Sequence, residues 1–301
     1  TIADDGGSIA LTVTDIIQNN ASLTVTYAQS STTSKKITGT SDGNAVSSVS
    51  VGQSVTVTND VSAPTISSVS STLDTVTKGI GEIIPIQILF NEVVNVQGTP
   101  QLALETGDTD AIAYYASGSG TNTLTFNYTV AAGHNVTDLD YKATTSLTLP
   151  TNSDTIRDNL STNATLTLAT PGATNSLGAN EAITIEAVRP TVSTYAADAG
   201  TTTVTLTMSE AVSGAPDATD FTVTNAASGE NTVTAATIAD DGGSIALTLT
   251  NMIQNSADLS VTYAQSSTDS KKITDANGNE MVSVTTGQSV TVTNDVSAPT
   301  I

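Results

Sequence analysis

The word TIADDGGSIALT occurs twice in this chain, at Thr1–Thr12 and again at Thr237–Thr248. The two copies extend over residues 1–66 and 237–301, and both end in GQSVTVTNDVSAPTI. Apolar positions stay apolar between the copies, as where Leu249 replaces Val13. The offset of 236 residues (237 − 1) far exceeds the period of solenoid repeats, which is about 20–50 residues. The sequence therefore predicts a tandem array of whole domains.

Two proline-threonine junctions divide this period. SAPTI at Ser62–Ile66 matches VRPTV at Val188–Val192, and SAPTI returns at Ser297–Ile301. Proline restricts the backbone to extended forms and suits a short, stiff linker. We expect domains at 62–188 and 189–296, with 1–61 as the C-terminal half of a domain of the second type and 297–301 as the start of the next.

Strand patterns dominate both expected domains. In TTTVTLTMS (Thr201–Ser209) and LSVTYAQ (Leu259–Gln265), apolar residues alternate with Thr or Ser, which is the period of a half-buried strand. Such runs recur at the spacing of β-sandwiches. DIIQNN and its counterpart NMIQNS are expected to form one short helical turn. The predicted fold is all-β, with tandem Ig-like Greek-key β-sandwich domains in a linear array.

Composition excludes several classes of partner and chemistry. Lys and Arg total 8 against 29 Asp and Glu, a net charge of −21, so we expect neither nucleic acid nor anionic membrane as a partner. The absence of cysteine excludes thiol enzymes, disulfide frameworks and Cys-ligated zinc. The longest apolar stretch, Ile83–Phe90, is too short to span a bilayer, so no transmembrane segment is expected in this chain.

Catalytic motifs are not found. The single histidine, His134, lies in the turn-like AAGHNVTD and is expected to be exposed. Asp138 and Asp140 are two residues apart, but a glycosidase pair belongs in a deep cleft with aromatic residues, and only 3% of this chain is aromatic. No nucleophile elbow, phosphate loop or zinc motif appears. We predict that the chain is not an enzyme.

The acidic DDGG segment is predicted to be a turn. It joins the alternating runs TAATIA and SIALTLT, and Asp and Gly are typical of hairpin connections. Asp240 and Asp241 lack the ligand spacing of a calcium hand.

Several segments of the sequence resemble known bacterial repeats. DATDFTVT and KKITDANGNE resemble the swimming-motility surface protein (SwmB-like) repeat, and VNVQGTPQLALETGD with AGHNVTDLDY is similar to a repeat domain of very large bacterial surface proteins. These two known repeat types are bacterial Ig-like tandem repeat domains of giant surface proteins and adhesins. The resemblance implies an extracellular, cell-surface location and a role as spacer, stalk or filament body. The loop TIRDNLSTN (Thr155–Asn163) departs from the DAAGN-like loop of such relatives.

Acidic residues recur at corresponding places in the two domain types. Glu92 in LFNEVV and Glu210 in TMSEAV each follow an early strand, which places them at the pole facing the preceding domain. The junctions between domains contribute Asp60 and Glu186 at that pole. The loops before the last strands contribute Asp158 and Asp275. Carboxylate oxygens are ligands for Ca²⁺, which would stiffen the joint. The predicted metal ligands are Asp60, Glu92, Asp158, Glu186, Glu210 and Asp275.

The leading hypothesis is a structural segment of a bacterial surface fibre or adhesin stalk, a rod-like spacer whose partners are neighbouring copies of the same array. One alternative is a self-assembling filament subunit whose half domain 1–61 is completed by strand addition from a neighbour. The milder explanation, which we favour, is that the missing half lies upstream in a longer protein. Another alternative is a calcium-dependent adhesive module for surface glycans or other cells, with Tyr114, Tyr115 and Tyr195 as candidate contacts.

Overall fold

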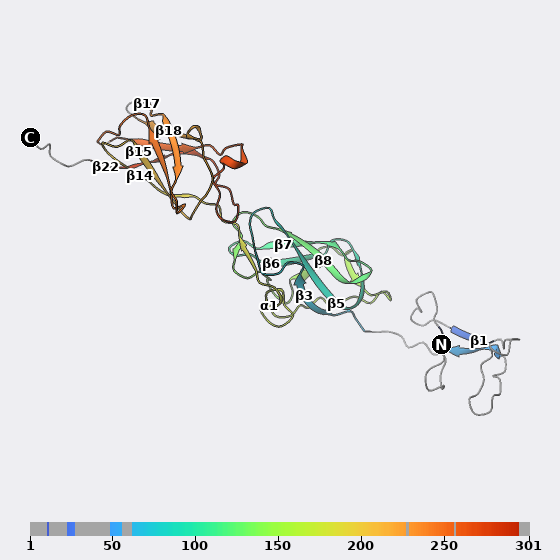
Figure 1. Cartoon of the computed structure of the whole chain (residues 1–301). Helices are drawn as coiled ribbons and strands as arrows, with labels where there is room; N and C mark the ends of the chain where they lie inside the picture. The colour runs from blue at the N-terminus through green and yellow to red at the C-terminus, as the bar shows by residue number, and fades with distance from the viewer. Residues whose placement is uncertain are drawn as a thin grey trace, which may run out of the picture.

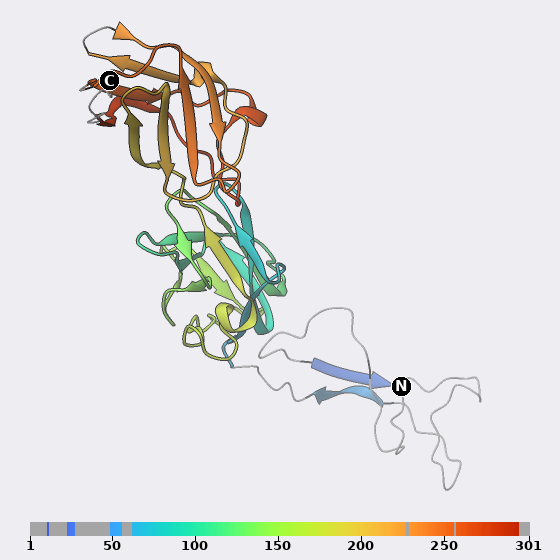
Figure 2. The ribbon, with the colours of Figure 1, turned by 60° about the vertical axis from the view of Figure 1, so that its left-hand side comes forward.

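The computed structural model describes residues 11, 23–27, 49–55, 62–226, 229–255 and 257–294. Two compact parts follow one another along the chain, each with its own hydrophobic core. We call residues 62–188 the first unit and residues 189–294 the second unit. Figures 1 and 2 show the two units placed end to end, the first in blue-green to yellow and the second in yellow-brown to red. Strands make up nearly all regular structure, which confirms the all-β prediction.

The first unit contains one large and one small sheet. The large sheet has the order β10-β6-β7-β8-β5-β12, with β11 added to β6 and β3 added to β5. The small sheet has the order β4-β13-β9. The elements are β3 (Ile66–Ser71), β4 (Val76–Lys78), β5 (Ile83–Gln97), β6 (Gln101–Glu105), β7 (Ala111–Ser117), β8 (Thr121–Thr129), β9 (Asn135–Val136), β10 (Asp140–Tyr141), β11 (Leu147–Thr148), β12 (Thr155–Arg157), α1 (Leu177–Asn180) and β13 (Ile183–Glu186).

Strand alternation builds the core of the first unit. Ile84, Ile86 and Ile88 of β5 are fully buried, whereas the residues between them face outward. Successive side chains of a strand point to opposite faces, so every second residue reaches the core. The aromatic rings of Phe126 and Tyr128 on β8 join the same cluster.

Two sheets enclose the core of the second unit. One has the order β18-β19-β15-β14-β22 and the other β17-β16-β20-β21, and buried residues of both belong to one cluster. Val204 and Leu206 come from the first sheet and Val223 and Val261 from the second. The elements are β14 (Val192–Asp198), β15 (Thr203–Met208), η2 (Ala218–Asp220), β16 (Phe221–Asn225), β17 (Gly229–Glu230), β18 (Val233–Ile238), β19 (Ser244–Leu249), β20 (Leu259–Tyr263), η3 (Asp269–Lys271), β21 (Val284–Ser289) and β22 (Thr291–Thr293).

The early and late strands of each unit pair in parallel. β4 pairs with β13 in the first unit, and β14 pairs with β22 in the second. All other pairings between named strands are antiparallel in the part of the chain described. Because parallel strands run in the same direction, the chain enters each unit at one end and leaves it at the other.

The repeated sequence forms the same hairpin twice. β1 (Leu23–Tyr27) pairs antiparallel with β2 (Val49–Val55), as β20 pairs with β21. Val25 faces Gln53 as Val261 faces Gln288, and both hairpins shift register at the following residues. The register is therefore a property of the repeated sequence itself.

One local prediction about a helical turn is wrong. Residues 251–255, part of NMIQNS, form no helix, because the Ile253 N–H donates to Thr201 O (2.8 Å) and Ile253 O accepts from Gly200 N–H (2.8 Å). These bonds tie the segment to the connection between β14 and β15. The counterpart DIIQNN lies outside the described residues. The short helix α1 forms instead after Ser176, whose hydroxyl caps its first turn.

No helix among the described residues combines the length and apolar character needed to cross a membrane.

Candidate metal and docking site between the two units

The DDGG turn supports the segment that carries Glu210. β18 ends at Ile238 and β19 begins at Ser244, with Ile238 opposite Ile245, so the predicted hairpin is confirmed for the second copy. The first copy of the word lies outside the described residues. Gly243 O accepts the Met208 N–H (3.0 Å) and Gly242 O accepts the Val212 N–H (3.0 Å). The turn therefore fixes the backbone on both sides of Glu210.

A backbone bridge places Asp275 beside the same segment. The Ser213 N–H donates to Thr274 O (2.8 Å) and the Thr274 N–H donates to Ser213 O (3.0 Å). Asp275 follows directly and is buried, with 4% of its surface exposed. Its Oδ1 accepts the backbone N–H groups of Asn277 and Asn279, both at 2.8 Å. These bonds fix the orientation of the carboxylate within its own loop.

Glu186 approaches this place from the first unit. It is the last residue of β13, where it pairs with Asn135 of β9. Beyond the linker proline, the Thr191 N–H donates to Ser209 Oγ (2.9 Å) and the Ser209 N–H donates to Thr191 O (2.8 Å). The linker is therefore held next to the residue that precedes Glu210.

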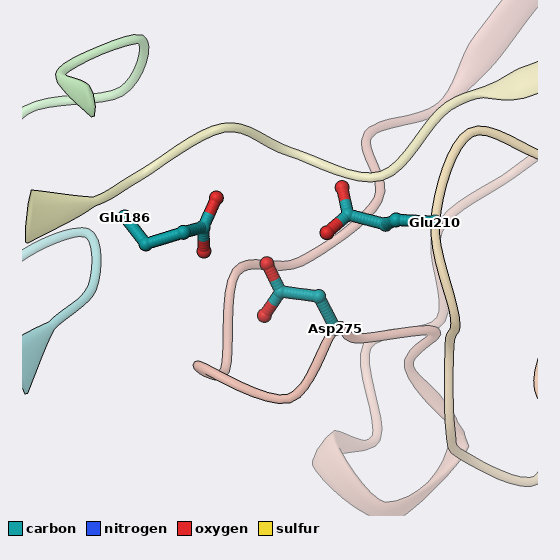
Figure 3. A group of neighbouring side chains, drawn as sticks. All are labelled: Glu186, Glu210 and Asp275. Atoms are coloured by element: carbon teal, nitrogen blue, oxygen red, sulfur yellow. The ribbon is translucent and has the colours of Figure 1, made fainter. Parts of the chain in front are cut away.

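The carboxylates of Glu186, Glu210 and Asp275 converge at the joint between the units. One oxygen from each lies within 4.8 Å of the other two. Figure 3 shows Glu186 and Glu210 pointing toward each other with Asp275 between and below them. The structure thus brings together three of the six residues that the sequence singled out as metal ligands.

The charges at this cluster are partly balanced by amide donors. Burial, followed by the charges of Asp275 and Glu186, raises the pKa of the Glu210 carboxyl above its usual value. Glu186 Oε2 accepts Asn277 Nδ2 (2.9 Å) and Asn279 Nδ2 (2.7 Å), and Asn279 Nδ2 also approaches Asp275 Oδ2 (2.8 Å). Burial and, after it, the two neighbouring charges therefore both disfavour the ionised form of Glu210.

The donor set fits a hard cation. Ca²⁺ takes about six to eight oxygen ligands at roughly 2.3–2.6 Å, and carboxylates are its preferred protein ligands. Three carboxylates on separate segments supply part of such a shell, and water would have to complete it. Because the ligands come from both units, an ion held here would connect the first unit to the second.

Two of the other three predicted ligands, Glu92 and Asp158, lie at the equivalent place in the first unit. Arg157 pairs with Asn95, as Thr274 pairs with Ser213, so Glu92 and Asp158 occupy positions equivalent to Glu210 and Asp275. Glu92 is half-buried and Asp158 is buried. Asp60 lies outside the described residues, so the predicted trio at this second joint stays a prediction.

His134 is buried, so the prediction of an exposed loop histidine is wrong. Only 6% of its surface is exposed, and its Nδ1 lies 2.7 Å from the Tyr128 hydroxyl. Desolvation lowers the pKa of the imidazole, which favours the neutral ring. The His134 side chain is therefore packed inside the first unit against Tyr128.

The remaining candidate residues, a pair of aspartates and three tyrosines, do not form one site. Asp138 and Asp140 flank the buried Leu139, and the pKa of Asp138 is raised by burial and by the charge of Asp140. Among the three candidate tyrosines, Tyr114 is 54% exposed, whereas Tyr115 packs edge-on against a core phenylalanine and Tyr195 lies against the second core.

Sequence reasoning missed the amides and the glycine that complete the joint. Asn277 and Asn279 follow Asp275 in the word DANGN, and Gly79 lies across the joint in the first unit. The two-residue spacing of the asparagines was a usable signal, but Glu186 lies 91 and 93 residues before them and Ile80 lies 199 residues before Asn279. Only the folded structure shows that they meet.

A model of a known family matches part of the second unit. A model described as "Putative flagellar system-associated repeat" matches residues 213–268, which include β16 to β20. The match supports a repeat family. Glu210 and Asp275 lie just outside the matched segment, on either side of it. No curated protein matches the chain.

Proposed function

We propose that this chain is a segment of a secreted, rod-like array on a bacterial surface, in which Ig-like Greek-key β-sandwich units act as spacers. The observation that carries the proposal is the parallel pairing of early and late strands in both units. When the chain enters a unit at one end and leaves it at the other, a short linker places successive units end to end. The sequence repeat and the match to a flagellar system-associated repeat support a structural role. The proposal assigns no catalytic activity.

The rod is tested by small-angle X-ray scattering of the full chain. We expect a distance distribution with a long tail and a cross-section close to that of one sandwich. A scattering curve typical of a flexible ensemble, or of a compact particle in which the units fold back on each other, would contradict the proposal.

We further propose that Ca²⁺ stiffens the joint through Glu186, Glu210 and Asp275. The support is that three acids from separate segments and from both units converge within 4.8 Å. With only three carboxylates, we expect weak binding, with a dissociation constant on the order of 10⁻⁴–10⁻³ M as in extracellular modules. Removal of the ion would leave like charges facing each other and loosen the joint.

Titration calorimetry with calcium chloride tests this site. Glu210→Gln should remove one binding event from the full chain, because it deletes a charge and keeps the shape of the side chain. Glu230→Gln is the matched control, since Glu230 is exposed on β17, away from the joint. An equal number of calcium ions bound by the native chain, Glu210→Gln and Glu230→Gln would exclude the site. That result would not contradict the proposal of a rod.

A further inference from the structure

Asn279 connects the two units through every polar atom of its side chain. It is buried, with 1% of its surface exposed. Its Oδ1 accepts the Ile80 N–H of the first unit (2.9 Å). Its Nδ2 lies 3.0 Å from Glu186 O and 2.7 Å from Glu186 Oε2, in addition to its contact with Asp275. A buried amide with its donor and acceptor both satisfied fixes one geometry of the joint.

The rest of the loop fits closely against the first unit. A Cβ on Gly79 would lie 2.6 Å from Asn277 O, so the absence of a side chain there lets the two backbones approach. Arg189 of the linker donates from Nη1 to Glu280 O (2.6 Å). The loop Asp275–Glu280 is thus held at its middle and at its end.

The first unit carries a loop with the same backbone and different side chains. Leu160 and Thr162 donate their N–H groups to Asp158 Oδ1 (2.8 and 2.7 Å), as Asn277 and Asn279 do to Asp275. Ser161 has a positive φ of 70°, close to the 82° at the equivalent glycine. The TIRDNLSTN loop therefore departs from the DANGN loop in composition but keeps its conformation.

The side chains that contact the neighbour differ between the two loops. Leucine and threonine stand where the second unit has its two asparagines, and neither can supply the side-chain N–H groups that reach Glu186. Within the described residues, Asp158 Oδ2 has no hydrogen-bond partner, whereas Asp275 Oδ2 is paired with the Asn279 amide.

We propose that the loop Asp275–Glu280 is a selective docking element, in which Asn277 and Asn279 recognise the C-terminal end of a first unit. The partner surface consists of Gly79, Ile80 and Glu186. This proposal rests on the proposed rod and adds that its joints are not interchangeable, because the Leu160–Thr162 version of the loop cannot make the same bonds. The order of the two unit types along the array would then be encoded at the joints.

Amide hydrogen exchange at Ile80 reports on this contact directly, because its N–H donates to Asn279 Oδ1. The variant is Asn279→Thr in the full chain, since Thr162 shows that threonine is compatible with this loop conformation. We expect exchange at Ile80 to accelerate about tenfold or more, which is the factor that loss of one such hydrogen bond produces. The amide of Ile84, within the β5–β8 pairing, should keep its protection and shows that the unit stays folded.

A second variant leaves the loop unchanged. Gly79→Ala inserts a methyl group against Asn277 O. We expect it to accelerate amide hydrogen exchange at Ile80 as much as Asn279→Thr does. The matched control is Asn122→Thr, the same chemical change at an exposed position far from the joint in β8. It should leave exchange at Ile80 unchanged.

The outcomes separate the docking element from the rod. Slow exchange at Ile80 in the native chain and in both variants would overturn the docking proposal, as would fast exchange at Ile80 in the native chain. In either case, extended scattering would leave the rod standing. Flexible scattering from the native chain would instead contradict the rod itself.

Discussion

At the scale of single residues, Gly242 links the repeated DDGG word to the joint. It has a positive φ of 70°, and a Cβ there would lie 2.6 Å from Val212 O and 2.8 Å from Val212 N. We expect Gly242→Ala to lower the free energy of unfolding by roughly 1–3 kcal/mol, because left-handed backbone strain adds to a clash with backbone atoms. Urea denaturation of the second unit measures this change. Gly200→Ala is the control, since Gly200 has a similar φ of 80° but open space around its Cα, and only the strain of about 1 kcal/mol should remain. Equal costs for the two variants would show that the close approach contributes nothing.

At the scale of elements, β5 shows how far alternation alone decides burial. Ile86 is fully buried and Leu89, three residues later on the opposite face, is 36% exposed. We expect Ile86→Ala to cost about 2–5 kcal/mol of unfolding free energy, because it removes transfer energy and leaves a cavity. Leu89→Ala should cost less than about 1 kcal/mol, since most of that surface is already hydrated. Denaturant titration of both variants gives the comparison, and similar losses would mean that β5 does not present one buried face.

At the scale of the whole molecule, the two hydrophobic cores share no buried residue. The contacts described at the joint are chiefly hydrogen bonds between loops, which couple the cores weakly. We expect calorimetry to show two unfolding transitions. Leu206→Ala in the second core should lower one melting temperature by roughly 10 °C or more, and Leu124→Ala in the first core should lower the other. A single transition that both variants shift would mean that the units unfold together.

The sequence by itself determined the strands and the turn, and it singled out the three acids that converge at the joint. Alternation of Thr with apolar residues is a local property, and it was sufficient for β15 and β20. The DDGG turn follows from the conformational freedom of Asp and Gly. The helical turn expected in NMIQNS does not form over the described residues 251–255, because backbone hydrogen bonds with Gly200 and Thr201, distant in sequence, outweigh a weak local preference. His134 was misplaced for a similar reason, since its ring contacts the Tyr128 hydroxyl and its carbonyl accepts the N–H of Ala187, which is more distant in sequence.

Only the tertiary structure decided what meets at the joint. Glu186, Glu210 and Asp275 were expected at one pole, but their separation and their amide partners depend on how the two units pack across the linker. Asn279 reaches Ile80 and Gly79 allows the approach because folding brings together segments that no local pattern connects. Periodicity fixes which side of a strand is apolar, whereas contacts between units depend on shape and hydrogen-bond geometry over the whole chain.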